Sequence, residues 1–189
     1  IGNPEPDFTY GIGNTFSYKG FDLSIYLNGS YGNEVVNWVR KDLENPRENT
    51  NLLKDALDYA QLELIHSDGP DDYRNIKIIG GDPHACRMAS SSASNTSNYR
   101  FSDKFVEDGS YLRIQSISLG YTLPQKWVTK VGLQNMKIYC NLQNVYTFTK
   151  YKGYDPEIGS ANQDALLTGF DNYRYPTPRI YTFGLNLTF

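Results

Sequence analysis

FTYGIGNTFSYKGFDLSIYLNGSY, residues 8–31, places an apolar side chain at almost every second position on both sides of a Lys19-Gly20 pair. A period of two is typical of a β-strand with one apolar face. A two-residue, glycine-containing connection between two such runs is typical of a tight hairpin. The stretch therefore predicts two antiparallel strands, over about 7–18 and 21–32.

The same alternation returns in three later stretches, over about 110–123, 136–149 and 179–189. In the last of them apolar residues at odd positions, such as Leu185, alternate with Thr182, Gly184 and Asn186. The positions opposite the apolar ones carry mostly Gly, Ser, Thr and Asn, with few charges. We therefore expect about five strands, each with one apolar and one small, polar face.

The connections between these strands are alternately short and long. The long ones span about 33–109 and 150–178, and the first is expected to hold two short amphipathic helices, near 35–43 and 53–64. Its SSSASNTS tract, residues 90–97, is read as an exposed polar loop. Because both tight turns then fall at one end of the sheet and both long loops at the other, the pattern resembles an outer-membrane β-barrel, which has short periplasmic turns and longer extracellular loops.

Aromatic residues make up 14% of the chain, with 16 Tyr against 2 Trp. In a barrel, aromatic side chains form belts where the apolar band meets water. The sequence places candidates for one belt at the turn end and for the other at the loop end: Tyr18, Phe21 and Phe189, and Phe8, Tyr31 and Tyr146.

The predicted fold class is all-β, with about five antiparallel strands of a large transmembrane β-barrel and short helices in a long extracellular loop. Five strands cannot close such a barrel, because unpaired edge N–H and C=O groups are too costly in lipid. The remaining strands are expected to come from a part of the protein outside this chain. The alternative is a soluble or surface-exposed β-sandwich, such as a carbohydrate-binding module, whose strands also alternate but turn their apolar face onto a second sheet.

Several other classes of function find no support in the sequence. A formal net charge of −3 and the lack of a basic run argue against a nucleic-acid partner. His66 and His84 lie in polar loops with no catalytic motif around them, so neither an enzyme nor a cofactor is predicted. Asp68, Asp71 and Asp72 do not follow a known calcium-loop spacing and are read as a solvated turn, so no metal site is predicted. The two cysteines, Cys86 and Cys140, do not indicate a disulfide framework.

Three longer stretches resemble the C-terminal region of the SusC/RagA family of TonB-dependent outer-membrane transporters. They are FVEDGSYLRIQSISLGYTLP (105–124), LQNMKIYCNLQNVYTFTKYKGYDPEIG (133–159) and YPTPRIYTFGLNLTF (175–189). The resemblance implies a barrel of roughly 22 strands with an N-terminal plug, of which this chain would be the last five strands. It also implies location in the bacterial outer membrane and import of oligosaccharides or peptides beneath a SusD-like lipoprotein. TonB would supply the energy through an N-terminal region that this chain lacks.

Four loop residues are candidates for contact with a ligand or with the lid protein: Trp38, Tyr154, Asp155 and Glu157. Tyr154 could offer an aromatic platform and the two carboxylates could accept sugar hydroxyls, although Asp155-Pro156 is also typical of a rigid turn. Trp38 is also the kind of residue that packs a loop helix. The alternating residues at the chain's end resemble the signal that directs barrel proteins into the membrane: Tyr181, Phe183, Leu185, Leu187 and Phe189.

Overall fold

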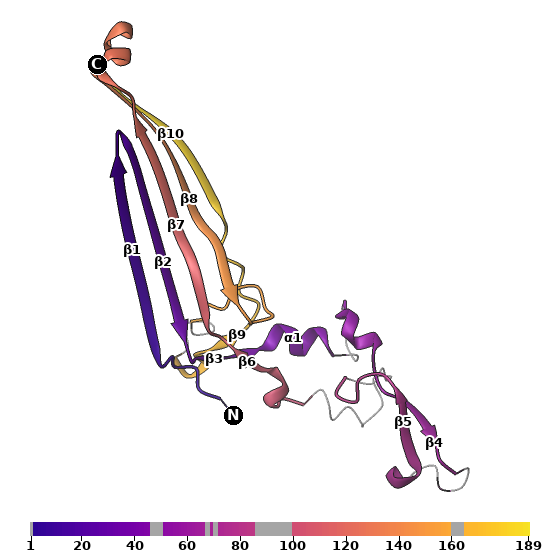
Figure 1. Ribbon diagram of the computed structural model, residues 1–189. Coiled ribbons are helices and arrows are strands. Elements are labelled where there is room, and N and C mark those ends of the chain that lie inside the picture. Colours follow the sequence, from indigo (N-terminus) through magenta and orange to yellow (C-terminus); the bar gives the residue numbers. More distant parts are fainter. Residues whose placement is uncertain (1, 46–50, 67–68, 70–71, 86–99, 160–164) are drawn as a thin grey trace. The chain divides into compact units, whose positions relative to one another are not determined.

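A computed structural model describes residues 2–45, 51–66, 69, 72–85, 100–159 and 165–189. Its main feature is a five-stranded antiparallel sheet of order β1-β2-β7-β8-β10 (Figure 1). The strands are β1 (Phe8–Tyr18), β2 (Phe21–Tyr31), β7 (Tyr111–Thr122), β8 (Asn135–Thr149) and β10 (Ile180–Thr188). The predicted class, about five antiparallel strands, is confirmed.

The strand register divides the sheet into two chemically different faces. Facing residues on neighbouring strands share a side, so each cross-strand row belongs to one face of the sheet. One side, the apolar face, carries four successive rows: Ile12, Leu27, Ile114 and Tyr146; Asn14, Ile25, Ile117, Leu142 and Tyr181; Phe16, Leu23, Leu119, Cys140 and Phe183; Tyr18, Phe21, Tyr121, Ile138 and Leu185. The other side, the polar face, includes Gly11, Asn28, Arg113 and Thr147, and further along Thr15, Ser24, Ser118, Asn141 and Thr182.

Aromatic pairs lie at both ends of the apolar face. At the loop end Phe8 stacks on Tyr31 at 5.3 Å between ring centroids, and Tyr146 meets Phe148 edge-on at 4.7 Å. At the turn end Phe21 stacks on Tyr121 at 4.2 Å. Aromatic pairs therefore border the apolar face at both ends.

The apolar face is not covered by another layer of the described residues. Phe183 and Leu185 are 78% and 51% exposed, and Ile12 and Phe16 are exposed as well. A β-sandwich would bury these side chains against a second sheet, so the described part of the chain is not a sandwich.

Backbone conformation explains the tight turn between β1 and β2. Lys19 and Gly20 both have positive φ, 46° and 87°, as a type I′ turn requires at its two central residues. The strands β7 and β8 are joined at the same end of the sheet through α2 (Gln125–Val128) and the 3₁₀ turn η5 (Thr129–Val131). Both short connections therefore leave the sheet at one end, as antiparallel pairing requires.

A bulge interrupts β7. Its register shifts between Ile114 and Ser116 against β8, and at the same level against β2. Since side chains alternate along a strand, an extra residue reverses the faces beyond it. Arg113 consequently lies in a row with Asn28 and Thr147 on the polar face, although its odd number would place it with Ile117.

The connection between β2 and β7 contains more strand than the sequence predicted. It holds β3 (Glu34–Asn37), α1 (Trp38–Leu43), η1 (Lys54–Leu57), β4 (Gln61–Leu64), η2 (Tyr73–Asn75), β5 (Ile76–Gly80), η4 (Asp103–Phe105) and β6 (Val106–Asp108). The helix expected over 35–43 begins only at Trp38, where the Asn37 side chain caps it by accepting from the Arg40 amide. The helix expected over 53–64 is wrong: a single 3₁₀ turn precedes β4, which pairs with β5. The 90–97 tract, Cys86, Asp68 and Asp71 lie outside the described residues.

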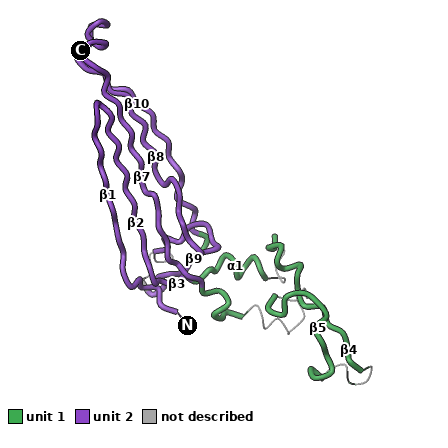
Figure 2. Tube along the Cα trace, in the orientation of Figure 1, with its two compact units in different colours: residues 1, 36–106, 171–173 green, residues 2–35, 107–170, 174–189 purple. Residues whose placement is uncertain are grey.

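The chain divides into two compact units (Figure 2). One contains residues 36–106 with 171–173, and the other contains 2–35, 107–170 and 174–189, including the five-stranded sheet. The connection between β8 and β10 adds η7 (Ala165–Leu167) and β9 (Phe170–Asp171), and β9 belongs to a small sheet of order β6-β3-β9. Among the described residues, no helix is long and apolar enough to cross a bilayer.

Candidate functional site

The most concentrated polar chemistry of the sheet unit surrounds Arg113 at the loop end of the polar face. The Arg113 side chain is 3% exposed. Its Nη2 donates to Asp155 Oδ1 at 2.5 Å, its Nη1 to Glu157 Oε2 at 2.7 Å, and its Nε to Thr147 Oγ1 at 3.0 Å. A strand residue thus holds two carboxylates of the loop between β8 and β10.

Asp155 bonds to other residues of this loop as well as to Arg113 on the strand. Its Oδ1 also accepts from the Glu157 amide at 3.0 Å, and its Oδ2 accepts from the Thr177 hydroxyl at 2.6 Å and the Thr177 amide at 3.3 Å. Burial raises the pKa of the Asp155 carboxyl, but the Thr177 hydroxyl, the Glu157 amide and the Arg113 charge together outweigh burial, so the pKa is lowered overall. Asp155 is therefore an ionised anchor that joins the start and the end of the loop.

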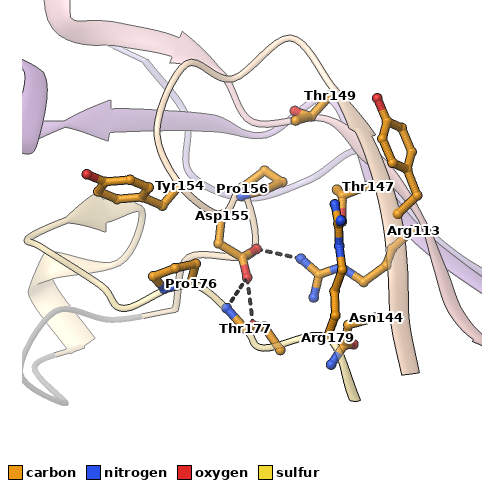
Figure 3. Close-up of a pocket in the computed structure, with 11 residues that line it drawn as sticks. Arg113, Asn144, Thr147, Thr149, Tyr154, Asp155, Pro156, Pro176, Thr177 and Arg179 are labelled. Carbon is orange, nitrogen blue, oxygen red and sulfur yellow. Dashed lines mark hydrogen bonds and ion pairs between the residues drawn. The ribbon is translucent and has the colours of Figure 1, made fainter. Parts of the chain in front are cut away.

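A cavity of about 290 Å³ lies beside this anchor (Figure 3). Its wall is formed by Arg113, Asn144, Tyr146, Thr147, Thr149, Tyr154, Asp155, Pro156, Pro176, Thr177 and Arg179. In the view of Figure 3 the Arg113 and Arg179 side chains lie on one side of Asp155 and the Tyr154 ring lies on the other. Tyr154 is 70% exposed. Arg179, at the end of the loop, is exposed and forms no hydrogen bond or ion pair with the part of the chain that the structure describes.

The candidate loop residues lie in different environments. Tyr154 and Asp155 both line the cavity, but Asp155 is buried and uses both of its oxygens. The Glu157 side chain is 47% exposed and is paired with Arg113. Trp38 lies in the other unit, where it packs on Phe101 at 6.1 Å and the Lys41 ammonium lies 4.1 Å from its ring centroid. The structure brings together Tyr154, Asp155 and Glu157, and Trp38 is part of a separate cluster.

Three residues of this site were not identified from the sequence: Arg113, Thr177 and Arg179. One signal was available for Arg113, because it is a lone charge in a strand that otherwise alternates uncharged residues. A charge at such a position needs a partner when it is buried.

A second ion pair lies toward the turn end of the polar face. Lys137 Nζ donates to Asp22 Oδ2 at 2.8 Å, and the Ser17 hydroxyl donates to Asp22 Oδ1 at 2.9 Å. Both charged side chains are partly exposed. The polar face therefore carries opposite charges in pairs, at two levels.

The residues expected to form an assembly signal point to the apolar side. Tyr181, Phe183, Leu185 and Leu187 face the apolar residues of β8 in register, from Leu142 to Met136, and Phe189 follows β10 with its side chain exposed. Their role in assembly stays a prediction.

Among the described residues, no group of three or more His, Cys, Asp or Glu is placed to hold a metal ion. Asp72 instead caps η2, accepting from the Arg74 amide, and pairs with the Arg74 side chain at 2.8 Å.

The chain is similar to TonB-dependent receptors. It is 32% identical over 193 residues to TonB-dependent receptor P3 of Formosa agariphila, across 100% of this chain and 17% of that protein. It is 26% identical over 190 residues to TonB-dependent receptor SusC of Bacteroides thetaiotaomicron, across 98% of this chain and 15% of that protein. No family model matches the chain.

A solved structure of the RagAB peptide importer in the open-open state has the same fold, with a TM-score of 0.67 at 23% identity over 98% of this chain and 17% of that one. At this identity the likeness concerns the fold alone. The chain spans 15% to 18% of the length of the curated relatives that it matches.

Proposed function

The chain belongs to the SusC/RagA family of TonB-dependent receptors, and we propose from this that the protein of which it is a part imports oligosaccharides or peptides across the bacterial outer membrane. In this proposal the chain supplies five strands of the barrel wall. The apolar face contacts lipid, and the polar face lines the interior.

One observation carries the proposal: a continuous apolar face that is exposed in the chain and bordered by aromatic pairs at both ends. Its strands have 9 to 15 residues, and about 9–11 residues of tilted strand cross the hydrocarbon of a bilayer. In water such a face would be a large exposed apolar patch, whereas in lipid it is solvated. Lipid therefore accounts for both its chemistry and its width.

The two edge strands fit a barrel that closes with other strands. β1 and β10 each pair on one side only within the described sheet. An edge in the hydrocarbon would leave backbone groups without partners, at several kcal/mol each. We infer that neighbouring strands outside this chain pair with β1 and β10.

The partners follow from the family. A SusD-like lipoprotein is proposed to cover the barrel at the loop end, and TonB to deliver energy through a region outside this chain. The connections 33–109 and 150–178 are then extracellular, and the Lys19-Gly20 turn and the α2–η5 connection are periplasmic. Trp38, in the longer extracellular connection, is a candidate contact for the lid protein.

Surface labelling of the whole receptor in living cells tests this topology. Single cysteines would be introduced at Tyr73, Tyr154 and Lys19 in a receptor freed of its native cysteines; the first two side chains are well exposed. A membrane-impermeant maleimide should label the Tyr73→Cys and Tyr154→Cys receptors in intact cells and the Lys19→Cys receptor only after lysis. Labelling of Lys19→Cys in intact cells, or recovery of the receptor in the soluble fraction, would contradict the proposal.

A further inference from the structure

We propose that the cavity beside Asp155 binds a carboxylate group of the imported substrate, with Arg179 as the recognising cation and Tyr154 as an apolar platform. The inference rests on the proposed function, because a substrate reaches this cavity only if the polar face lines the transport path. It concerns the chemical class of the substrate, which the family resemblance leaves open between oligosaccharides and peptides.

The carboxylates of the loop are already committed to other partners. Asp155 Oδ1 accepts from Arg113 and from the Glu157 amide, and Asp155 Oδ2 accepts twice from Thr177. Glu157 is paired with Arg113 and does not line the cavity. A sugar hydroxyl at Asp155 would therefore compete with the contacts that hold the loop, and Glu157 would accept one only outside the cavity.

The uncommitted charge at the cavity is positive. Arg179 lines the cavity, is exposed, and has no partner among the described residues. Among the charged residues that line the cavity, Asp155 balances Arg113 and Arg179 is the remaining cation. Glu157, the second carboxylate on Arg113, brings the whole cluster to neutrality but lies outside the lining. A planar guanidinium can donate two parallel hydrogen bonds to a carboxylate, so this is the group that Arg179 fits best.

The rest of the wall suits a small ring or side chain that carries such a carboxylate. The Tyr154 ring is largely exposed, and Pro156 and Pro176 add apolar surface. The Thr147 hydroxyl accepts from Arg113 and still has its own hydrogen to donate. A volume of about 290 Å³ is small for a ligand pocket, so it would take one acidic sugar unit or one acidic residue of a longer substrate.

Calorimetry on the purified whole receptor tests the inference with four probes. Trigalacturonate and the corresponding neutral galactose trimer test an acidic sugar. Triglutamate and triglutamine, both N-acetylated and C-amidated so that only side chains can supply a carboxylate, test an acidic peptide. We expect one acid to bind and its neutral counterpart to bind about 10-fold to 100-fold more weakly, since hydrogen bonds to charged groups contribute about 1.5–3 kcal/mol. Whichever acid binds identifies the source of the carboxylate.

Variants separate a specific site from general attraction. Arg179→Ala should weaken binding of that acid by about 10-fold to 100-fold. Arg179→Lys should bind more tightly than Arg179→Ala but less tightly than the parent, because lysine keeps the positive charge but lacks the two parallel N–H donors of the guanidinium. Lys152→Ala is the matched control, since Lys152 is an exposed cation of the same loop that does not line the cavity. It should leave binding unchanged. Each variant is compared only at normal outer-membrane level and normal melting temperature.

Several results would overturn the inference: none of the four probes binds, an acid and its neutral counterpart bind equally well, Arg179→Ala binds as tightly as the parent, or Lys152→Ala loses as much as Arg179→Ala. A receptor that shows the expected labelling topology but gives any of these results refutes the carboxylate site alone. A receptor that fails the labelling test refutes the proposed function itself.

Discussion

Replacement of Ile117 by arginine tests which face of the sheet meets lipid. Ile117 lies in the middle of β7, in an apolar row with Ile25 of β2 and Leu142 of β8. The row is about equally far from the aromatic pairs at the two ends, so it is expected near the bilayer midplane. Arginine on a lipid face costs about 2–4 kcal/mol at that depth and about 0–1 kcal/mol near the interfaces.

This cost corresponds to a shift of about 30-fold to 700-fold in the folding equilibrium, at about 1.4 kcal/mol for each factor of ten. The control is Ser118→Arg, one residue along the same strand. Ser118 lies between Ser24 and Asn141 on the polar face, where an added cation stays in a polar interior. The two variants have the same charge and the same strand, and differ only in the face that carries the arginine.

The measurement is the amount of folded whole receptor in purified outer membranes, by immunoblot of unheated and boiled samples. Ile117→Arg should be strongly depleted, and Ser118→Arg should remain near the parental level. Equal levels of the two variants, or depletion of Ser118→Arg alone, would refute the assigned orientation.

Three further predictions concern the loop anchor and the bulge. Arg113→Met should leave Asp155 buried without its cation, at about 3–5 kcal/mol, and should make the loop between β8 and β10 sensitive to added protease in membranes where the parent resists. The pKa of the Asp155 carboxyl is lowered in the folded state, so the anchor is intact above the ordinary pKa of 3.8 and weakens as the pH falls through the folded-state pKa. Pepsin should therefore cut the loop only below pH 3.8. Cutting that begins at higher pH would contradict this assignment. Deletion of Gln115 should remove the β7 bulge and turn Arg113 toward lipid, so the deletion should lower the outer-membrane level of the receptor. Gln115→Ser, which keeps the number of residues in β7, should not.

The five long strands could be predicted because the information is local and repeated. Each has several consecutive alternating positions, and a one-residue error in register would turn the whole apolar set to the wrong side. The Lys19-Gly20 turn could also be predicted from the sequence, because a turn with positive φ at both central positions favours a glycine-containing pair.

The short strands of the long connection could not be predicted in the same way. β4 has only four residues, and Leu57, Ala60 and Leu64 also fit a helical spacing. What decides in favour of a strand is pairing with β5, where Leu62 faces Ile78 and Leu64 faces Ile76. A pairing partner that lies beyond a loop overrides the local pattern.

The loop anchor was hidden for a related reason, which also explains why its arginine is tolerated in a membrane strand. Strict alternation along β7 gives Arg113 the same side as Ile117 and Leu119, and a cation there would face lipid. The register shift between Ile114 and Ser116 reverses the faces, so Arg113 lies opposite Thr147 and within reach of Asp155, 42 residues further along the chain. The bulge and the ion pair therefore depend on each other: without the bulge the arginine has no acceptor, and without the carboxylates the bulge would bury an unpaired charge. The sequence contains both halves of this arrangement, a lone arginine in a strand and an Asp-Pro turn with a nearby glutamate, but only the three-dimensional register joins them.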